Sequence, residues 1–416
     1  MTSRPSLREA GWAFAADGGA GIGGALERFL ASLPTRPRLF GLGEPMHGVE
    51  AFPRLRNQAF EYLVEHDGYR SIAIETDCLA ALTIDAFVAD GTGELGEVMR
   101  SGFSHGFEKA EANRELVAWM RQYNRSRAAS DRLRFYGFDA PMEMTGANSP
   151  RPALTALQAY LATNLEPALL PAMAGAIDTL AGADERWSNA AAILDPSRSV
   201  GASDEANKLR LLADDLAAVL IAESPRLIAS TSRDAWWRAD LQARTAAGLL
   251  RYHAAMADAS DARVARLLGL RDVMMADNIA AILTREGQRG PTLMFGHNLH
   301  LQQGRSKWHL GDLSLEWWSV GSIIGAQLGD QYAILAAALG AAPQQGLVAP
   351  APDTLEGTLC ALPESRYLFR SESLIGALGT APTLVLRTDT APNNGYFPLD
   401  PYRLNEAAGV IFLRDV

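Results

Sequence analysis

Short apolar runs bounded by turn residues recur along the chain, and they constrain its fold more than any other feature. They are Leu39–Leu42, Ser71–Ile74, Leu133–Phe138, Thr292–Phe295, Tyr332–Ala337, Thr383–Leu386 and Val410–Leu413. Runs of this length are typical of buried strands. Helical patterns separate the early runs, for example over Glu111–Tyr123. Short strands that alternate with helices predict an α/β fold with a mostly parallel central sheet flanked by helices.

The character of the sequence changes between Met142 and Leu270. Strand-like runs nearly vanish there, and apolar residues recur at helical spacing, as in the stripe of Leu154, Leu157 and Leu161. We therefore expect an α/β core made of residues 1–141 and 271–416. Residues 142–270 are expected to be inserted between the third and fourth strands as an all-helical lobe. We expect this lobe to form one wall of an active-site cleft.

Composition restricts the class of protein. Of the 416 residues, 48% are hydrophobic, which is enough for a substantial core. The net charge of −10 argues against nucleic acid or an anionic membrane surface as the main partner. No apolar stretch approaches the ~18 residues of a transmembrane helix, and the amino end does not resemble a targeting segment. The two cysteines, Cys78 and Cys360, do not make a disulfide framework. These observations predict a cytoplasmic monomer or dimer.

Residues capable of acid–base chemistry follow four of the predicted strands. Glu44 and His47 follow the first strand, Glu75 ends the second, Asp139 ends the third and His297 ends the fourth. The carboxyl ends of parallel strands meet at one edge of a sheet, where such folds bind their ligands. We therefore expect these side chains to converge at a single site.

The residue types at this edge suit proton transfer to and from water. A histidine has an ordinary pKa of about 6.5 and can move protons near neutral pH. A carboxylate on one ring nitrogen, supplied by Glu44 or Glu75, would leave the other nitrogen of His47 free to take a proton from water. His297 would then stabilise negative charge or protonate a leaving alcohol. Arg56, nine residues after His47, would act as a clamp on a carbonyl oxygen or on a carboxylate partner.

The motif Gly43-Glu44-x-x-His47-Gly48 and several later segments resemble the erythromycin esterase family. The later segments are Phe52-x-Arg54-Leu55-Arg56, Ala73–Asp77, Phe135–Asp139, Arg271-Asp272-x-x-Met275-Ala276-x-Asn278 and Gly296-His297-Asn298-x-His300. The resemblance runs roughly from Leu39 to Leu339. It implies an ester hydrolase that acts on a small-molecule ester or macrolactone, in antibiotic resistance or secondary metabolism. It also implies histidine-activated water, with no covalent intermediate and no cofactor.

The resemblance also assigns roles to single residues. It implies that His47 is the general base and that Glu44, Glu75, His297 and Arg56 fill the other catalytic positions. It implies a weaker assignment of Arg271 to substrate binding.

Two parts of the chain are expected to line the substrate cleft. One is the segment Gly102–Phe107, where the family commonly has an aromatic-rich segment, and it would contribute Phe103, Ser104 and His105. Another departure from the family is Val49-Glu50-Ala51, which replaces a further His and Glu. The second expected part is the pair Trp236 and Trp237, which would give a bulky substrate an apolar wall from the helical lobe.

The segment Gly102–Phe107 also fits Gly-x-Ser-x-Gly, the nucleophile elbow of serine hydrolases, with Ser104 as nucleophile. An elbow requires a buried strand immediately before it. The preceding residues Glu94–Arg100 are polar and helix-like. This favours a loop that lines the cleft over a nucleophile.

Three alternatives to a metal-free hydrolase remain at this point. Two histidines and two glutamates at one edge would suit a metal-dependent hydrolase, with His297 and His300 three residues apart. The same base would suit a biosynthetic acyl transfer or cyclisation. A non-catalytic binder of small molecules is the third. The remaining histidines are scattered without convergent partners and are expected to have no catalytic role; they are His66, His105, His253 and His309.

Overall fold

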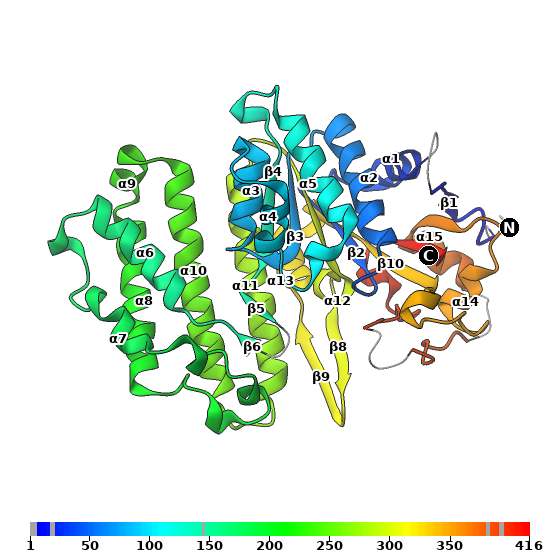
Figure 1. Ribbon diagram of the computed structural model, residues 1–416. Coiled ribbons are helices and arrows are strands. Elements are labelled where there is room, and N and C mark those ends of the chain that lie inside the picture. The colour runs from blue at the N-terminus through cyan, green and yellow to red at the C-terminus, as the bar shows by residue number, and fades with distance from the viewer. Residues whose placement is uncertain (1–5, 17–20, 144–145, 380–382, 391–394) are drawn as a thin grey trace.

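An eight-stranded sheet forms the centre of the computed structural model, which describes residues 6–16, 21–143, 146–379, 383–390 and 395–416 (Figure 1). In spatial order the strands are β1 (Gly11–Ala13), β11 (Arg366–Arg370), β12 (Gly409–Asp415), β10 (Tyr332–Ala341), β2 (Leu39–Glu44), β7 (Thr292–His297), β3 (Ser71–Asp77) and β4 (Arg134–Asp139). The six strands from β12 to β4 are parallel, and at one edge β11 pairs antiparallel with β12 and β1 pairs antiparallel with β11. The predicted mostly parallel sheet is confirmed.

Six of the seven predicted strands are present, and one is not. The run Thr383–Leu386 forms only an isolated bridge between Val385 and Thr354. Val385 and Leu386 are exposed, so their side chains do not pack into the core as those of a buried strand would. The sequence prediction also missed β1, β11 and a hairpin of β8 (Arg305–Leu310) and β9 (Leu313–Trp318). Gly311, with φ of 57°, allows the tight turn of this hairpin, which projects from the molecule in Figure 1.

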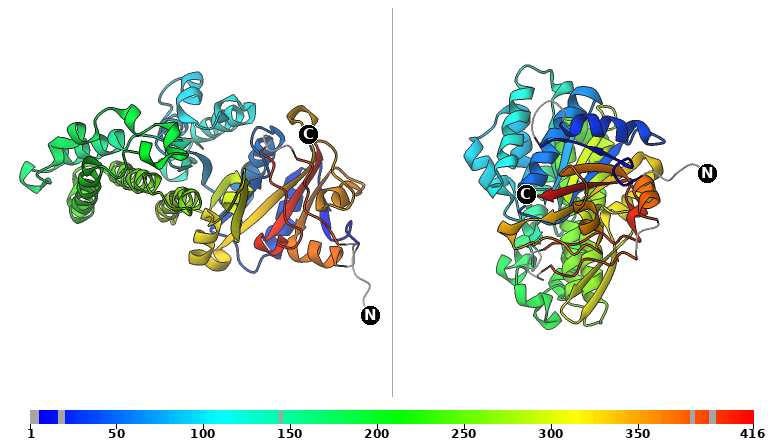
Figure 2. Two further views of the ribbon diagram at one scale, coloured as in Figure 1. Left: turned by 90° about the horizontal axis from the view of Figure 1, so that it is seen from below. Right: turned by 90° about the vertical axis from the view of Figure 1, so that its right-hand side faces the viewer.

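Helices cover both faces of the sheet (Figure 2). One face packs against α1 (Ile22–Ser32), α2 (Ala51–His66), α3 (Ala81–Asp90), α4 (Leu95–Gly102) and α5 (Glu111–Asn124). The other face packs against α11 (Arg263–Glu286) and α13 (Val320–Leu328). Successive residues of β3 show the alternation, because Ile72 and Ile74 face the first layer and Ala73 faces the second. Burial on both faces explains why the strands are apolar throughout.

Two short helices lie near the edge of the sheet that carries β11 and β12. They are α14 (Leu355–Cys360) and α15 (Ser371–Leu378), and they share an apolar cluster with these strands. None of the helices in the described ranges is long and apolar enough to span a membrane.

Between residues 151 and 256, all of which the structure describes, the chain forms helices and turns and no strand. The helices are α6 (Arg151–Asn164), α7 (Ile177–Ala181), α8 (Asp204–Ala222), α9 (Ser224–Ser230) and α10 (Arg233–Met256), which gather beside the sheet in Figure 1. Leucines at helical spacing supply a separate apolar cluster, and Ser203 and Ser232 cap the starts of α8 and α10. The expected boundary at residue 270 falls inside α11, which packs on both α10 and the sheet.

Candidate active site

The carboxyl ends of β2, β7 and β3 bring the predicted acid–base residues together. Glu44, the last residue of β2, is the register partner of His297, the last residue of β7. Gly43 allows this arrangement, because a Cβ atom there would lie 2.2 Å from Oδ1 of Asn298. The Asn298 side chain bonds both the N–H and the C=O of Ala337 on β10, which fixes the strand ends relative to one another. The site therefore lies on hydrogen-bonded sheet rather than on loops alone.

His47 lies in the turn between β2 and α2, and Glu44 orients its ring. Oε1 of the buried Glu44 carboxylate accepts a hydrogen bond from Nδ1 of His47 at 2.7 Å. Nε2 therefore carries the lone pair, and 40% of the His47 side chain is exposed to solvent. Burial lowers the pKa of His47, but the hydrogen bond that its ring donates to Glu44 and the charge of Glu75 outweigh burial, so the pKa is raised. This geometry suits a base that takes a proton from water.

Glu75, at the end of β3, is the centre of the charged groups. Its Oε2 accepts a hydrogen bond from the backbone N–H of His297 at 2.7 Å. Its Oε1 lies 3.4 Å from Nε2 of His300, 3.5 Å from Nη2 of Arg271 and 3.8 Å from Nε2 of His47. Burial raises the pKa of Glu75, but these basic partners lower it to about 2. Glu75 is thus a buried, ionised carboxylate that holds three basic side chains around it.

His297 joins the site, but its ring nitrogens are both engaged by the backbone. Nε2 donates to the carbonyl of Pro45 at 3.1 Å, and Nδ1 accepts from the N–H of Leu299 at 3.2 Å. Burial and the neighbouring His47 lower its pKa to about 3, so the ring is neutral. Its centroid lies 5.3 Å from that of His47. In this arrangement His297 has no free N–H to offer a leaving alcohol.

His300 and Asp272 form a pair in the site that the sequence did not identify as catalytic. Nδ1 of His300 donates to Oδ1 of Asp272 at 2.7 Å. Asp272 also accepts from Nε1 of Trp317 at 2.5 Å and from the N–H of Val320 at 3.0 Å. Burial lowers the pKa of His300, but Asp272 and Glu75 raise it on balance. His300 could have been identified from the sequence by its position within the family segment Gly296-His297-Asn298-x-His300.

Arg271 and His105 meet at Asp139, the last residue of β4. Nε and Nη2 of Arg271 bind the Asp139 carboxylate, the latter at 2.6 Å. Nε2 of His105 donates to the same carboxylate at 2.9 Å, and its Nδ1 donates to Glu143 at 2.7 Å. The expectation that His105 lacks convergent partners is therefore wrong. Its partners come from β4 and β5 (Met142–Glu143), more than 30 residues away in sequence.

Arg56 lies beneath the site rather than beside a substrate. Its side chain is fully buried and donates to the side-chain oxygens of Asn57 and Asn113. Its guanidinium carbon lies 4.9 Å from the centre of the Phe295 ring. Burial lowers the pKa of Arg56 to about 9, and the charge of Glu44 opposes this. Arg56 supports the ionised form of Glu44, against the burial that raises the pKa of that carboxyl.

Phe103 and Ser104, both in the Gly102–Phe107 segment, make contacts within the protein. Phe103 is buried against Phe135, with ring centroids 5.6 Å apart, so it belongs to the core and does not line a cleft. Oγ of Ser104 accepts a hydrogen bond from the N–H of Asp77 at 2.9 Å. Helix α4, not a strand, precedes Ser104. The nucleophile elbow is therefore not formed.

Among the described residues, the contacts of Trp236 and Trp237 lie away from His47. Nε1 of Trp236 donates to the carbonyl of Leu220 within the helical region. Trp237 packs against Tyr136 and lies beneath the Arg285 guanidinium. Both rings fill the layer between α10 and the sheet, where they exclude water from the core.

Other aromatic rings do border the acid–base residues. The Phe107 ring lies 5.2 Å from that of His47, and the Phe397 ring lies 5.1 Å from that of His297. Trp308 of β8 continues the row, 6.4 Å from Phe397. No periodic pattern marks Phe397, because it lies in a segment without regular secondary structure. These half-buried rings give the site an apolar border.

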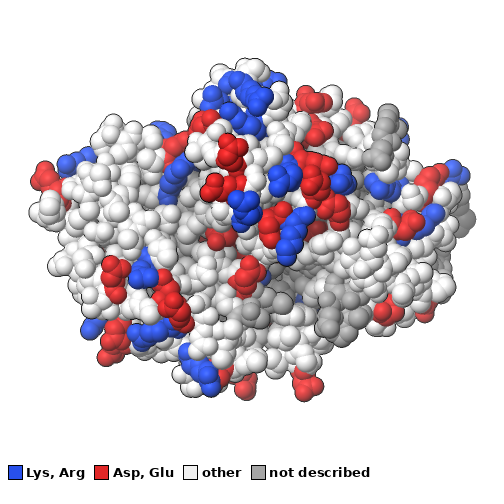
Figure 3. Space-filling model, viewed as in Figure 1, with Lys and Arg blue, Asp and Glu red and all other residues white. Residues whose placement is uncertain are grey.

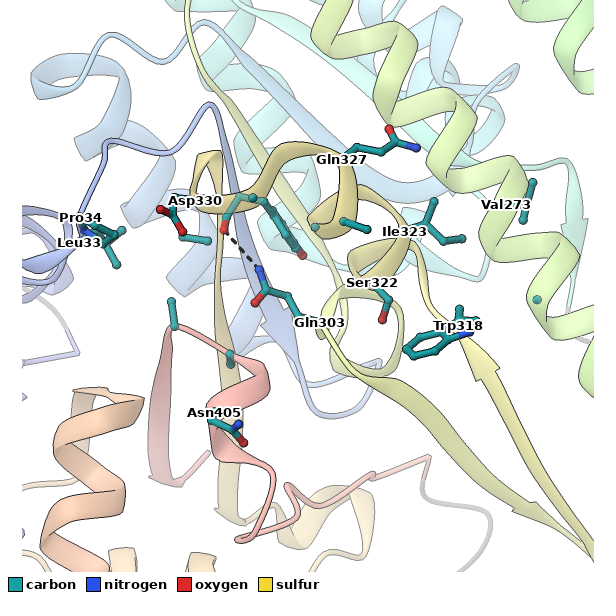
Figure 4. Close-up of a pocket in the computed structure, with 18 of the residues that line it drawn as sticks. Leu33, Pro34, Val273, Gln303, Trp318, Ser322, Ile323, Gln327, Asp330 and Asn405 are labelled. Carbon is teal, nitrogen blue, oxygen red and sulfur yellow. Dashed lines mark hydrogen bonds between the residues drawn. The ribbon is translucent and has the colours of Figure 1, made fainter.

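A cavity of about 1200 Å³ lies elsewhere (Figure 4). Its lining includes Leu33 before β2, Tyr332 at the start of β10 and Asn405 before β12, so it opens at the amino ends of these strands. The acid–base residues lie at the carboxyl ends, and none of them lines the cavity.

In the parts of the chain that the structure describes, no group of three or more His, Cys, Asp or Glu residues is arranged to hold a metal ion. Figure 3 shows acidic and basic side chains interspersed on one face of the molecule.

Comparison with known proteins gives one family and three solved structures. A family model described as erythromycin esterase matches residues 64–411, a span that begins after Glu44 and His47. A Bacillus cereus protein is 17% identical with a TM-score of 0.73, and the match covers 99% of this chain and 96% of that one. A succinoglycan biosynthesis protein is 15% identical with a TM-score of 0.69, covering 99% and 95%.

The third structure is a mutant of the erythromycin esterase EreC in its open conformation. It is 16% identical with a TM-score of 0.64, covering 95% of this chain and 94% of that one. At these identities the three structures establish the fold alone. Among curated proteins, none matches the sequence at a significant level.

Proposed function

Because the chain belongs to the erythromycin esterase family, we propose that it hydrolyses a carboxylic ester with water that His47 activates. The observation that carries this proposal is the Glu44–His47 pair at 2.7 Å, on a His47 side chain that is 40% exposed and whose Nε2 lies 3.8 Å from Oε1 of Glu75. A carboxylate on Nδ1 fixes the tautomer that accepts a proton at Nε2. Family membership supports an ester hydrolase, and the geometry supplies a base for it.

The proposed reaction begins when Nε2 of His47 takes a proton from water as the water oxygen attacks the ester carbonyl. The C=O bond becomes a C–O⁻ bond in a tetrahedral intermediate. As that intermediate collapses, the C–O bond to the alcohol breaks and Nε2 returns its proton to the leaving oxygen. The products are one acid and one alcohol, and His47 regains its starting form. No covalent bond between substrate and protein forms in this reaction.

We assign the stabilisation of the oxyanion to His300 and Arg271. Both lie at Oε1 of Glu75, and both are partly open, with 12% and 15% of their side chains exposed. Cationic donors placed where negative charge develops are typically worth 10²–10³-fold in rate. His297, whose nitrogens are engaged by Pro45 and Leu299, then serves to hold the His47 loop in place.

We propose a small-molecule ester with an apolar part as substrate, and a macrolactone as its first candidate. The aromatic rings of Phe107 and Phe397 beside the two histidines support this. Most of a large ligand's surface must be buried by such apolar walls, and the helices of residues 142–270 would supply the second wall. An acyl transfer with the same base would differ only in using an alcohol in place of water.

The test is hydrolysis of erythromycin and of 4-nitrophenyl acetate, followed by mass spectrometry and absorbance. Addition of one water to the macrolide, lost in His47→Asn, would support the proposal. Full activity in His47→Asn would refute it. Activity that a chelator abolishes and one metal restores would favour the metal-dependent alternative. Macrolide that binds equally to wild type and variant without turnover would identify a non-catalytic binder.

A further inference from the structure

His105 has an unusual backbone conformation for its residue type. Its φ angle is +59°, and it is the one non-glycine residue with positive φ among those that the structure describes. The left-handed region costs an ordinary residue roughly 1–2 kcal/mol. Such strain persists where the surroundings hold a residue in place, and it gathers at functional sites.

Both ring nitrogens of His105 face carboxylates. Nδ1 lies 2.7 Å from Oε2 of Glu143, and Nε2 lies 2.9 Å from Oδ2 of Asp139. The backbone N–H of His105 also donates to Oε1 of Glu143 at 3.1 Å. A neutral imidazole has only one N–H, so two carboxylates can be satisfied only by the imidazolium. Burial lowers the pKa of His105, but the hydrogen bond to Asp139 and its charge raise it on balance.

This imidazolium begins a series of alternating charges that leads to His47. Asp139 binds Arg271 on its other side, and Arg271 lies 3.5 Å from Glu75. Glu75 in turn lies 3.8 Å from Nε2 of His47. The Phe107 ring lies between the two histidines, 5.7 Å from His105 and 5.2 Å from His47. The charged groups that act on His105 are Asp139 on β4, Glu143 on β5, Arg271 on α11, Glu75 and Asp77 on β3, and His47.

We propose that His105 is a positioning residue of the hydrolytic site. Its imidazolium holds Asp139 and Arg271 against Glu75, and its positive charge opposes the protonation of His47 that the neighbouring carboxylates favour. The second part rests on the proposed function of His47 as the base. Because both ring nitrogens are engaged, His105 offers no free donor to a substrate, which differs from the expectation that it binds substrate directly.

The test is NMR titration of the seven histidines in protein labelled with ¹³C at Cε1 of histidine. The wild type and His105→Asn are compared, because asparagine tolerates the left-handed conformation well. We expect the His105 signal to remain that of an imidazolium at neutral pH. We expect His47 to titrate at a higher pH in His105→Asn than in the wild type, because a nearby positive charge has been removed. A neutral His105 at pH 7, or an unchanged His47 titration, would overturn the proposal.

Two further variants make the test independent of folding and turnover. His66→Asn removes an exposed histidine of α2 and should leave the His47 titration unchanged. Glu143→Gln changes an exposed side chain and should move the His105 titration to lower pH without unfolding the protein. If Glu143→Gln leaves the His105 titration in place, the assigned charge pairing is wrong. Because no step of the titration requires substrate, its result stands apart from the outcome of the hydrolysis assay.

The activity measurement then separates positioning from simple structural support. If wild type hydrolyses the ester, the acidic limb of kcat/KM in His105→Asn should move to higher pH together with the His47 titration. A uniform loss of kcat/KM at every pH would show a structural role only and would contradict the proposal.

Discussion

Oε2 of Glu75 on β3 accepts a hydrogen bond from the backbone N–H of His297, the last residue of β7, at 2.7 Å. These strands are adjacent and parallel, with Ile74 opposite Phe295 just before the two site residues. The bond fixes the carboxylate by sheet register and leaves Oε1 facing His47, His300 and Arg271. The charge at the centre of the site is therefore placed by the register of the central strands.

Gly296→Ala should displace Glu75 and reduce activity. A Cβ atom at Gly296 would lie 2.8 Å from Oε2 and 3.1 Å from Cβ of Glu75. Glu75 sits on a central strand and has little room to move, so we expect a destabilisation of about 1–3 kcal/mol. Activity should fall more than stability explains, measured as kcat in the folded fraction.

Gly24→Ala provides the matched control for this substitution. Gly24 lies in α1, where an added Cβ would have no atom within 4 Å, so stability should be unchanged or slightly higher. Equal effects of the two glycine substitutions would contradict the tight fit at Gly296.

Glu75→Gln should change how stability depends on pH. The pKa of Glu75 is about 2 in the folded protein, below its ordinary value of 4.5. A lowered pKa contributes stability that is present above the unfolded pKa and is lost as pH falls through the folded one. The contribution at neutral pH is of order 3 kcal/mol. The urea midpoint of wild type should therefore exceed that of Glu75→Gln at pH 7, and the gap should narrow from about pH 5 toward pH 2.

Carboxylates remote from the site titrate in both proteins, so the difference in urea midpoint reports Glu75 together with His47 and His300, whose pKa values it raises. If the difference in urea midpoint between wild type and Glu75→Gln stays constant from pH 7 to pH 3, the basic neighbours do not lower the pKa of Glu75.

Glu44→Gln should lower both the rate and the pH at which the enzyme becomes active. Loss of the orienting carboxylate on a catalytic histidine typically costs about 10²–10⁴-fold in kcat. The hydrogen bond from His47 to the Glu44 carboxylate raises the pKa of His47, so its removal should move the acidic limb of kcat/KM to lower pH. Glu65→Gln, an exposed carboxylate of α2, is the control and should match wild type. An acidic limb that moves to higher pH would mean that another group titrates.

The core of this site could be predicted from sequence because parallel strands impose it. Glu44, Glu75 and His297 each end an apolar run, and the sheet brings such ends together whatever the intervening loops do. His47 follows by three residues and cannot lie far away. Local patterns therefore sufficed for these residues and for the parallel strands that carry them.

The remaining residues depend on long-range packing that no local pattern encodes. Asp272 and His300 are 28 residues apart, and they meet because α11, which carries Asp272, lies beside α12 (Asn298–Leu301), which carries His300. His105 looked isolated because its partners lie on other elements. Strand β11 was missed because its apolar part is three residues long and lies between arginines. Periodicity reports which face of an element is buried, and not which element covers it.

Phe397→Ala should weaken binding of apolar esters and leave the chemistry intact. The Phe397 ring borders His297 and Trp308 without contributing an acid or a base. Removing apolar contact of this size costs about 1–2 kcal/mol, which is on the order of a tenfold rise in KM. The rise should appear with 4-nitrophenyl decanoate and be small with 4-nitrophenyl acetate, because the short acyl group cannot reach the ring. Tyr402→Ala, an exposed ring in the same carboxyl-terminal region, should change neither constant. A fall in kcat with unchanged KM would place Phe397 among the residues that orient the histidines instead.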